Sequence, residues 1–406
     1  MINQHVLHQQ GYDFLLNHLR RNKVSAPSFQ TIVPTATAWL ESQNYQVPRP
    51  EWERLRDSII YALVGFGPLE VWLKDPAISE IMINNYDQVY LEKAGRLERS
   101  ELTFTSNEQL LQIINRMVAP LGRRIDESQP MVDARLPDGS RINAIIPPLS
   151  LCGPVLTVRK FAAKPFTMSA MIESESINHW VAELFKLIVA QKQNILISGG
   201  TGAGKTSTLN ALAGLIPNSE RIITIEDSAE INIEHPHLIT LESRVANVEG
   251  KGMVQIRDLL KNALRMRPDR ILVGEIRGEE AIDMLQAMNT GHEGSITTVH
   301  ANAPLESLYR LETMVLMGAV KLPLAAIRPQ IKQGIHWILQ QKRLANGSRK
   351  ITEISYLEAS TDRDEYDLKS VVRFNFVKRK FEATGYVPLV VTNHGSKQLQ
   401  QWCKNK

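Results

Sequence analysis

The sequence predicts an α/β protein in which a mainly parallel sheet forms the larger domain, behind a smaller α/β domain and a helical N-terminal segment. In the second half of the chain, short apolar runs alternate with helical stretches, which is typical of a parallel sheet covered on both faces. Strand-like runs with one amphipathic helix precede them and indicate a separate small sheet. We expect four parts: an accessory helical segment (1–63), the small α/β domain (64–165), the larger domain (166–346) and a poorly defined tail (347–406).

Composition sets broad limits on the class of protein. The chain has 406 residues, of which 43% are hydrophobic and 22% charged, as in ordinary globular proteins. No apolar run approaches the ~20 residues that a membrane span needs, and the N-terminus lacks a secretory pattern. Cys152 and Cys403 form neither a zinc spacing nor a disulfide framework, so we expect a reducing cytoplasm. The net charge of +4 argues strongly for neither lipid nor nucleic acid.

Periodicity predicts the elements of the first domains. One helical face is marked by Trp52, Leu55, Ile59, Ile60 and Leu63, and four prolines punctuate the preceding segment at positions 27, 34, 48 and 50. Residues 81–83 and 89–91 flank a polar turn and indicate a β-hairpin, with a further strand at about residue 97. A helix is expected over Asn107–Val118. The remaining strands are expected over residues 131–136, 141–146 and 155–159.

A linker is expected over residues 162–177, followed by the alternation of strands and helices. The expected strands are 195–197, 222–225, 271–273 and 296–299, and the expected helices are 206–215, 255–266, 279–288, 304–317 and 327–341. Two edge strands are expected in the tail, over 352–357 and 371–376.

A glycine-rich loop, GGTGAGKT at Gly199–Thr206, lies between the first of these strands and a helix. It fits the phosphate-binding pattern G-x-x-x-x-G-K-[ST] in the strand–loop–helix context that the pattern requires. Glycines let the backbone approach a phosphate, and the N–H groups at the helix start face the anion. Lys205 is expected to reach the β- and γ-phosphates, and the Thr206 hydroxyl to bind Mg²⁺. The alternative is a chance glycine-rich turn.

Polar residues follow three further strands of this sheet. Glu226 and Asp227 end one strand, with Glu230 three residues on; Glu275 follows a second strand and His300 a third. The carboxyl ends of parallel strands share one edge with the phosphate loop, so these groups are expected to meet there. Each also has a simpler interpretation, because a carboxylate after a strand often only caps the next helix and a single histidine is often structural.

Together these motifs resemble the type II/type IV secretion ATPase superfamily. The four boxes are GGTGAGKT, TIEDSAEI (Thr224–Ile231), ILVGEIRG (Ile271–Gly278) and GSITTVHAN (Gly294–Asn302), and the resemblance extends from about Val64 to Arg343. In its motifs, the sequence most resembles the Flp/Tad pilus assembly ATPases and their relatives in type IV secretion and conjugation. The resemblance implies a RecA-like P-loop ATPase domain preceded by a smaller, PAS-like α/β domain. Two cysteines cannot build the four-cysteine zinc module of many type II export ATPases.

The resemblance also implies roles for individual residues. Catalytic roles fall to Lys205, Glu230, Glu275 and His300, where Glu230 orients or deprotonates water and His300 senses the γ-phosphate. Metal contacts fall to Thr206 and Glu275. The nucleotide-binding set is Gly200, Thr201, Gly202, Ala203, Gly204, Lys205, Thr206, Ser207, Glu226, Asp227, Arg135, Arg141 and Arg159. Taken alone, the three arginines are as readily surface residues.

The resemblance implies ATP and Mg²⁺ as cofactors and a homohexamer docked on inner-membrane platform proteins, cytoplasmic and peripheral at the inner face of the membrane. The function that the resemblance implies is to power pilus assembly or macromolecule export; the alternative is conjugative or effector-translocating type IV secretion. A nucleic-acid-dependent RecA-like ATPase is a further alternative. It needs a basic, aromatic-rich groove, and at 6% aromatic residues no such cluster stands out. A nucleotide-binding scaffold without hydrolysis is disfavoured by Glu230 and Glu275 together.

Overall fold

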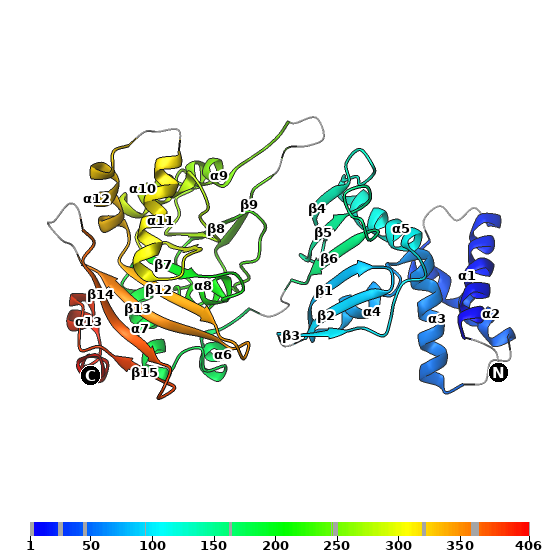
Figure 1. Cartoon of the computed structure of the whole chain (residues 1–406), viewed down its shortest axis with the longest axis horizontal. Coiled ribbons are helices and arrows are strands. Elements are labelled where there is room, and N and C mark those ends of the chain that lie inside the picture. Colours follow the sequence, from blue (N-terminus) through cyan, green and yellow to red (C-terminus); the bar gives the residue numbers. More distant parts are fainter. Residues whose placement is uncertain are drawn as a thin grey trace. The chain divides into compact units, whose positions relative to one another are not determined.

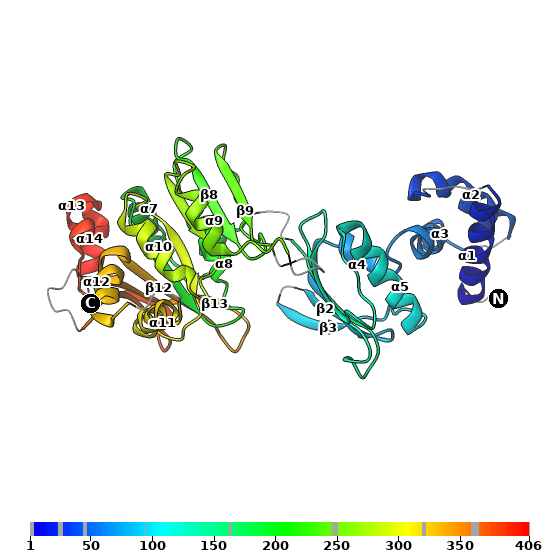
Figure 2. The ribbon, with the colours of Figure 1, turned by 90° about the horizontal axis from the view of Figure 1, so that it is seen from above.

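The computed structural model describes residues 4–22, 27–43, 47–93, 95–161, 165–244, 246, 251–318, 322–358 and 365–405. The chain divides into two compact units, Met1–Ala163 and Lys164–Lys406, each with its own buried cores (Figures 1 and 2). Within the described ranges, no helix has both the length and the apolar character needed to cross a bilayer.

Three helices begin the first unit: α1 (Gln4–Arg21), α2 (Phe29–Ser42) and α3 (Arg49–Val64). They pack pairwise around a small apolar core that includes Leu7, Leu40 and Ile60. The helical face predicted from Trp52 to Leu63 is confirmed, with Trp52, Leu55, Ile59 and Ile60 buried in α3. Of the four prolines, Pro34 lies inside α2, where the buried face of the helix compensates for the one lost backbone donor.

An antiparallel sheet of order β3-β2-β1-β6-β5-β4 forms the rest of this unit. Its strands are β1 (Ile78–Asn85), β2 (Gln88–Lys93), β3 (Arg96–Arg99), β4 (Met131–Arg135), β5 (Arg141–Ile145) and β6 (Val155–Arg159). Its helices are α4 (Leu69–Lys74), α5 (Asn107–Val118) and a short 3-10 turn, η1 (Ala119–Leu121). The predicted hairpin and the predicted helix over Asn107–Val118 are confirmed. Apolar residues of α5 and of the strands form a common core, because each presents one buried face.

The second unit is built on a nine-stranded sheet of order β15-β14-β13-β12-β7-β11-β10-β8-β9. The strands from β9 to β12 in this order are parallel, and β12 to β15 continue the sheet as antiparallel hairpins. The strands are β7 (Ile195–Gly199), β8 (Ile222–Glu226), β9 (Leu238–Glu242), β10 (Arg270–Val273), β11 (Ile296–Val299), β12 (Trp337–Arg343), β13 (Arg349–Leu357), β14 (Leu368–Asn375) and β15 (Lys380–Ala383).

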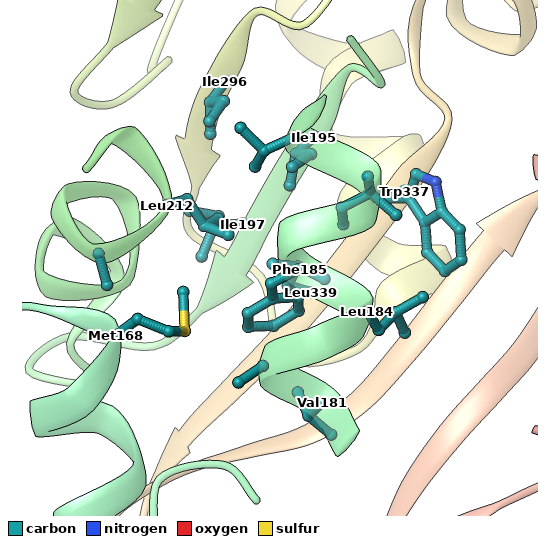
Figure 3. Close-up of a cluster of buried hydrophobic side chains, with 14 of the residues drawn as sticks. Met168, Val181, Leu184, Phe185, Ile195, Ile197, Leu212, Ile296, Trp337 and Leu339 are labelled. Atoms are coloured by element: carbon teal, nitrogen blue, oxygen red, sulfur yellow. The ribbon is translucent and has the colours of Figure 1, made fainter. Parts of the chain in front are cut away.

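Helices cover both faces of this sheet. Buried residues of α6 (Met168–Glu173), α7 (His179–Ala190), α8 (Lys205–Ala213), α13 (Leu389–His394) and α14 (Lys397–Lys404) share one core, part of which Figure 3 shows around Phe185. Those of α9 (Ile256–Ala263), α10 (Glu280–Asn289), α11 (Pro304–Met317) and α12 (Leu324–Gly334) share the other. Within β7, Ile195 and Ile197 face the first core and Leu196 the second, as expected for a central strand buried on both sides.

Buried Asn194 fixes the start of β7 against its neighbours. Its Nδ2 donates to the carbonyls of Met288 (3.2 Å) and Gly334 (2.8 Å), while its Oδ1 accepts from the N–H groups of Gly294 (2.7 Å) and Ser295 (3.0 Å). One side chain therefore joins the ends of α10 and α12 to the start of β11. Since both polar atoms of the amide are hydrogen-bonded, these bonds compensate for the desolvation of the Asn194 side chain.

Several sequence predictions for this unit are wrong. The helix expected over 327–341 ends at Gly334, and Trp337–Arg343 is strand β12. Trp337 and Leu339 face one core and Ile338 the other, and a short apolar run of this kind cannot be told from a helix by periodicity alone. The linker expected over 162–177 contains helix α6.

The residues after 346 continue the sheet. The predicted strands there correspond to β13 and β14, but both lie inside the sheet, and the edge strand on that side is β15. The expected boundary at 346 falls in the turn of the β12–β13 hairpin.

Candidate active site

The phosphate loop connects β7 to α8 at the carboxyl edge of the parallel strands. Gly202 and Gly204 have φ of 69° and 97°, in the left-handed region that favours glycine, so the chain turns sharply before Lys205 begins the helix. Lys205 Nζ donates back to the carbonyl of Gly199 at 3.1 Å. The predicted residues from Gly200 to Ser207 thus form one loop and first helical turn, whose N–H groups suit an anion.

The expected carboxylates lie on neighbouring strands at the same edge, and two of them join a chain of alternating charges. Lys205 Nζ is 3.9 Å from Glu275 Oε1. Glu275 Oε2 accepts from Arg277 Nη2 at 2.7 Å and from Nε at 3.0 Å, and Arg277 Nη1 is 3.7 Å from Asp227 Oδ2. Burial lowers the pKa of the Lys205 ammonium, an effect that Glu275 partly offsets and that Arg277 adds to. The hydrogen bonds that Arg277 donates to Glu275 raise the pKa of Arg277.

Glu226 is buried beneath the loop that carries Glu230. Its Oε1 accepts from the N–H groups of Glu230 (2.9 Å) and Ile231 (3.0 Å). Gly274 makes room for it, because a Cβ at position 274 would lie 2.8 Å from Glu226 Cγ. The structure therefore places Glu226 as a support that shapes the Glu230 loop. His300 follows β11 directly, on the strand next to β7.

Two arginines beside the phosphate loop were not expected. Arg343 and Arg349 are register partners at the turn of the β12–β13 hairpin, and Arg349 Nε donates to the carbonyl of Gly202 at 3.1 Å. Gly204 accommodates the arginine stem, since an added Cβ would lie 2.9 Å from Arg349 Cδ. The misassigned helix hid this hairpin. Its signal was the Asn346-Gly347 pair, a strong hairpin turn sequence, in which Gly347 has φ of 84°.

Arg277 was also missed as a site residue. It lies two positions after Glu275 in the same box, but the sequence gives no sign that its guanidinium folds back onto that carboxylate.

In the first unit, the three predicted arginines form a row across neighbouring strands. Arg135 pairs in register with Arg141, Arg141 with Arg159, and Arg159 with Glu80. Register partners in an antiparallel sheet point to the same face, so three positive charges lie side by side. The Arg135 guanidinium also lies over the Phe161 ring, 5.8 Å from its centroid. Planar guanidinium groups in such an array suit phosphate oxygens.

For a metal ion, the described residues contain no cluster of three His, Cys, Asp or Glu side chains arranged to bind one. A dedicated protein cage is not what Mg²⁺ needs beside a nucleotide, because phosphates and water supply most of its ligands. The Thr206 hydroxyl in the first turn of α8 and the Glu275 carboxylate, 3.9 Å from Lys205, offer the sparse oxygen set that fits this ion.

Comparisons with known proteins find relatives over most of the chain. The family model described as type II/IV secretion system protein matches residues 62–372. A putative conjugal transfer protein of Mycobacterium tuberculosis is 38% identical over 307 residues, covering 74% of this chain and 87% of that protein. The type IV secretion system protein VirB11 of Bartonella henselae is 31% identical over 338 residues, covering 74% and 94%. The ATPase DotB of Legionella pneumophila has a similar fold, with 24% identity, a TM-score of 0.52, and coverage of 73% and 81%.

Proposed function

Since the chain belongs to the type II/IV secretion system protein family and is an ATP hydrolase of that family, we propose that it uses hydrolysis at the phosphate-loop edge to drive pilus assembly or macromolecule export. The observation that carries the proposal is the chain of charges from Lys205 through Glu275 and Arg277 to Asp227. It lies at the carboxyl edge of the sheet, beside the loop whose backbone suits a phosphate.

In the proposed reaction, water attacks the γ-phosphorus and the bond to the β,γ-bridging oxygen breaks, giving ADP and phosphate. Lys205 leaves the loop carbonyls and neutralises the β- and γ-phosphate oxygens, which is the largest contribution expected in phosphoryl transfer. Glu230 orients the water and accepts its proton, held in place by Glu226 beneath its loop. His300 contacts the γ-phosphate, and Asp227 supports Arg277. Mg²⁺, held by Thr206 and Glu275, would neutralise charge on the phosphates.

The arginine row is proposed as the second cationic surface for the same nucleotide. Arg135, Arg141 and Arg159 would contact the phosphates from the first unit of the same subunit or of a neighbour in a homohexamer. Nucleotide turnover would then change how the two units are held, and a ring would pass that motion to membrane partners.

The division into an accessory helical segment, a small α/β domain and an ATPase domain is proposed as the functional domain organisation of the protein.

Location and partners follow from the proposed role. We infer a cytoplasmic protein that is peripheral at the inner face of the membrane and docks on platform proteins of a pilus or secretion system. A second candidate is conjugative or effector-translocating type IV secretion, which the similarity to the Mycobacterium and Bartonella proteins named above favours. Neighbouring prepilin and prepilin peptidase genes would support the pilus; neighbouring conjugation genes would support the second candidate.

Phosphate release by the purified full chain tests the proposed chemistry. We expect Mg²⁺-dependent ATP turnover in a hexameric ring, with or without phospholipid, and its loss in Glu275→Gln with ATP binding retained. Glu173→Gln is the matched control, because Glu173 is exposed at the end of α6. Full turnover in Glu275→Gln would show that this carboxylate is not needed for hydrolysis. A wild-type ring without turnover would contradict the proposal that hydrolysis drives pilus assembly or export.

A further inference from the structure

The turn between β14 and β15 presents apolar and basic side chains together at the surface. We call residues Phe376–Lys380 the hairpin tip; β14 and β15 are the outermost strands on one side of the nine-stranded sheet (Figure 1). Val377 is 94% exposed and Phe376 is 56% exposed. Lys378, Arg379 and Lys380 follow directly. Hairpin turns ordinarily use glycine, asparagine or aspartate, so two large apolar residues here call for an explanation.

Local contacts hold the hairpin tip in this conformation. Asn375 Oδ1 accepts from the N–H groups of Val377 and Lys378, each at 3.0 Å. The ring of Phe376 packs edge-on against Phe374, with 5.2 Å between centroids, and Phe374 packs in turn against Phe381. These contacts hold the backbone of the turn and the ring of Phe376 before any partner arrives, which reduces the entropy lost on binding.

The charge of the hairpin tip is positive on balance. Lys378 and Lys380 side chains are each 61% exposed. Glu382 Oε1 lies 3.1 Å from Lys378 Nζ and 3.6 Å from Lys380 Nζ, and these two lysines share that single carboxylate. Three cations therefore accompany one anion. An apolar apex flanked by cations matches an anionic bilayer, because the apolar groups enter the boundary below the headgroups while lysine and arginine remain among the phosphates.

We propose that the hairpin tip docks this protein on the surface of an anionic lipid bilayer. The proposal rests on the membrane location inferred above and names the element that makes the contact. β14 runs parallel to β7, since β12 is parallel to β7 and two antiparallel steps separate β12 from β14. The hairpin tip consequently lies at the same edge of the sheet as the phosphate loop, and docking would turn that edge of the second unit toward the membrane.

Vesicle flotation of the full chain tests the contact. We expect binding to vesicles that mix phosphatidylglycerol with phosphatidylcholine, weakening with added salt, and no binding to phosphatidylcholine alone. Phe376→Ser with Val377→Ser, and Lys378→Glu with Arg379→Glu, should each weaken binding at least about tenfold. Leu389→Ser and Lys397→Glu are the matched controls, because both residues are exposed on other elements of the same unit. The controls should bind as the wild type does.

Three results would overturn the proposal: no binding of the wild type to anionic vesicles, unchanged binding of both hairpin-tip variants, or a change of ring mass in those variants without lipid. The last would assign the hairpin tip to contacts between copies of this chain. ATP turnover without vesicles separates this inference from the proposed function. Normal turnover with absent vesicle binding would reject the docking surface alone, whereas absent turnover would reject the proposed function.

Discussion

The phosphate-loop edge and the arginine row bring charged residues together by different means. At the phosphate-loop edge, Lys205, Glu275, Arg277 and Asp227 alternate in sign and lie in the segments that follow three parallel strands, β7, β10 and β8. In the arginine row, three charges of one sign come from neighbouring antiparallel strands in register. The first arrangement is balanced within the unit itself. The second sets like charges opposite one another, which weakens a sheet.

This difference assigns different parts to the two regions. A balanced site is assembled before the nucleotide arrives, and its ion pairs must rearrange when phosphates enter. A row of arginines gains directly from a bound anion, because the anion offsets their mutual repulsion. Substitutions at the phosphate-loop edge should therefore reduce the chemical step, whereas substitutions in the arginine row should reduce nucleotide affinity.

Lys205→Ala should have the largest effect. It removes the cation that we propose faces the developing charge of the transition state, so turnover should fall at least about 100-fold. Folding should be nearly unaffected, because Glu275 keeps its bonds to Arg277. Phosphate release and thermal unfolding measure the two quantities. Lys186→Ala, on the exposed surface of α7, is the control. Turnover of Lys205→Ala equal to that control would contradict the role of the phosphate loop.

Arg141→Ala tests the arginine row at its centre. Loss of the charged hydrogen bond that we propose between Arg141 and a phosphate should raise the KM for ATP about tenfold with a smaller change in kcat. The free energy of unfolding should change by less than about 1 kcal/mol, because Arg141 is exposed on β5. Arg99→Ala on exposed strand β3 is the matched control. A lower kcat at unchanged KM would assign Arg141 to the chemical step and break the comparison.

Arg277→Ala should act on the phosphate-loop edge more weakly. The substitution frees Glu275 from the guanidinium that orients it, so kcat should fall about fivefold to tenfold while the KM for ATP changes little. Steady-state kinetics on the assembled ring separate the two constants. Arg373→Ala serves for comparison, since Arg373 is an exposed arginine paired to Glu353 elsewhere in the sheet. Faster turnover than wild type would instead make Arg277 a restraint on Glu275.

The residues of the phosphate-loop edge could be predicted from the sequence because a simple rule places them. Residues that follow parallel strands meet at one edge, so Lys205, Glu275 and Asp227 could be placed together from strand ends alone. Sequence reasoning did not reach Arg349, because the apolar run before it was assigned to a helix and its hairpin was lost. Strand register was equally out of reach: nothing in the sequence says that Arg135, Arg141 and Arg159 lie opposite one another, and only the resemblance connected them to phosphate.

Fold prediction failed at strands β12 and β9. β12 has the apolar character of a buried helix, and β9 alternates only weakly, with no residue fully buried. By contrast, α5 has one clean buried face from Leu110 to Val118 and was placed correctly at both ends. Strands β7, β8, β10 and β11 are also buried on both faces and were predicted as strands, so burial alone does not explain the error at β12. The difference is that β12 begins three residues after the end of α12, and the helical pattern was extended across it.

His336 directly precedes β12, at the opposite end of the parallel strands from the phosphate-loop edge, so its substitution should leave turnover at neutral pH nearly unchanged and act on stability alone. Its Nδ1 accepts the N–H of Asn194 at 2.9 Å, and His336→Ala should cost about 1–3 kcal/mol of unfolding free energy by leaving that donor unsatisfied. Burial lowers the pKa of His336, with Glu293 opposing the shift. The unfolded chain therefore takes up a proton first as pH falls below about 6.5, and stability falls with it. Denaturant unfolding at several pH values should show a shallower acid slope in His336→Gln, and equal slopes would contradict a neutral, buried imidazole.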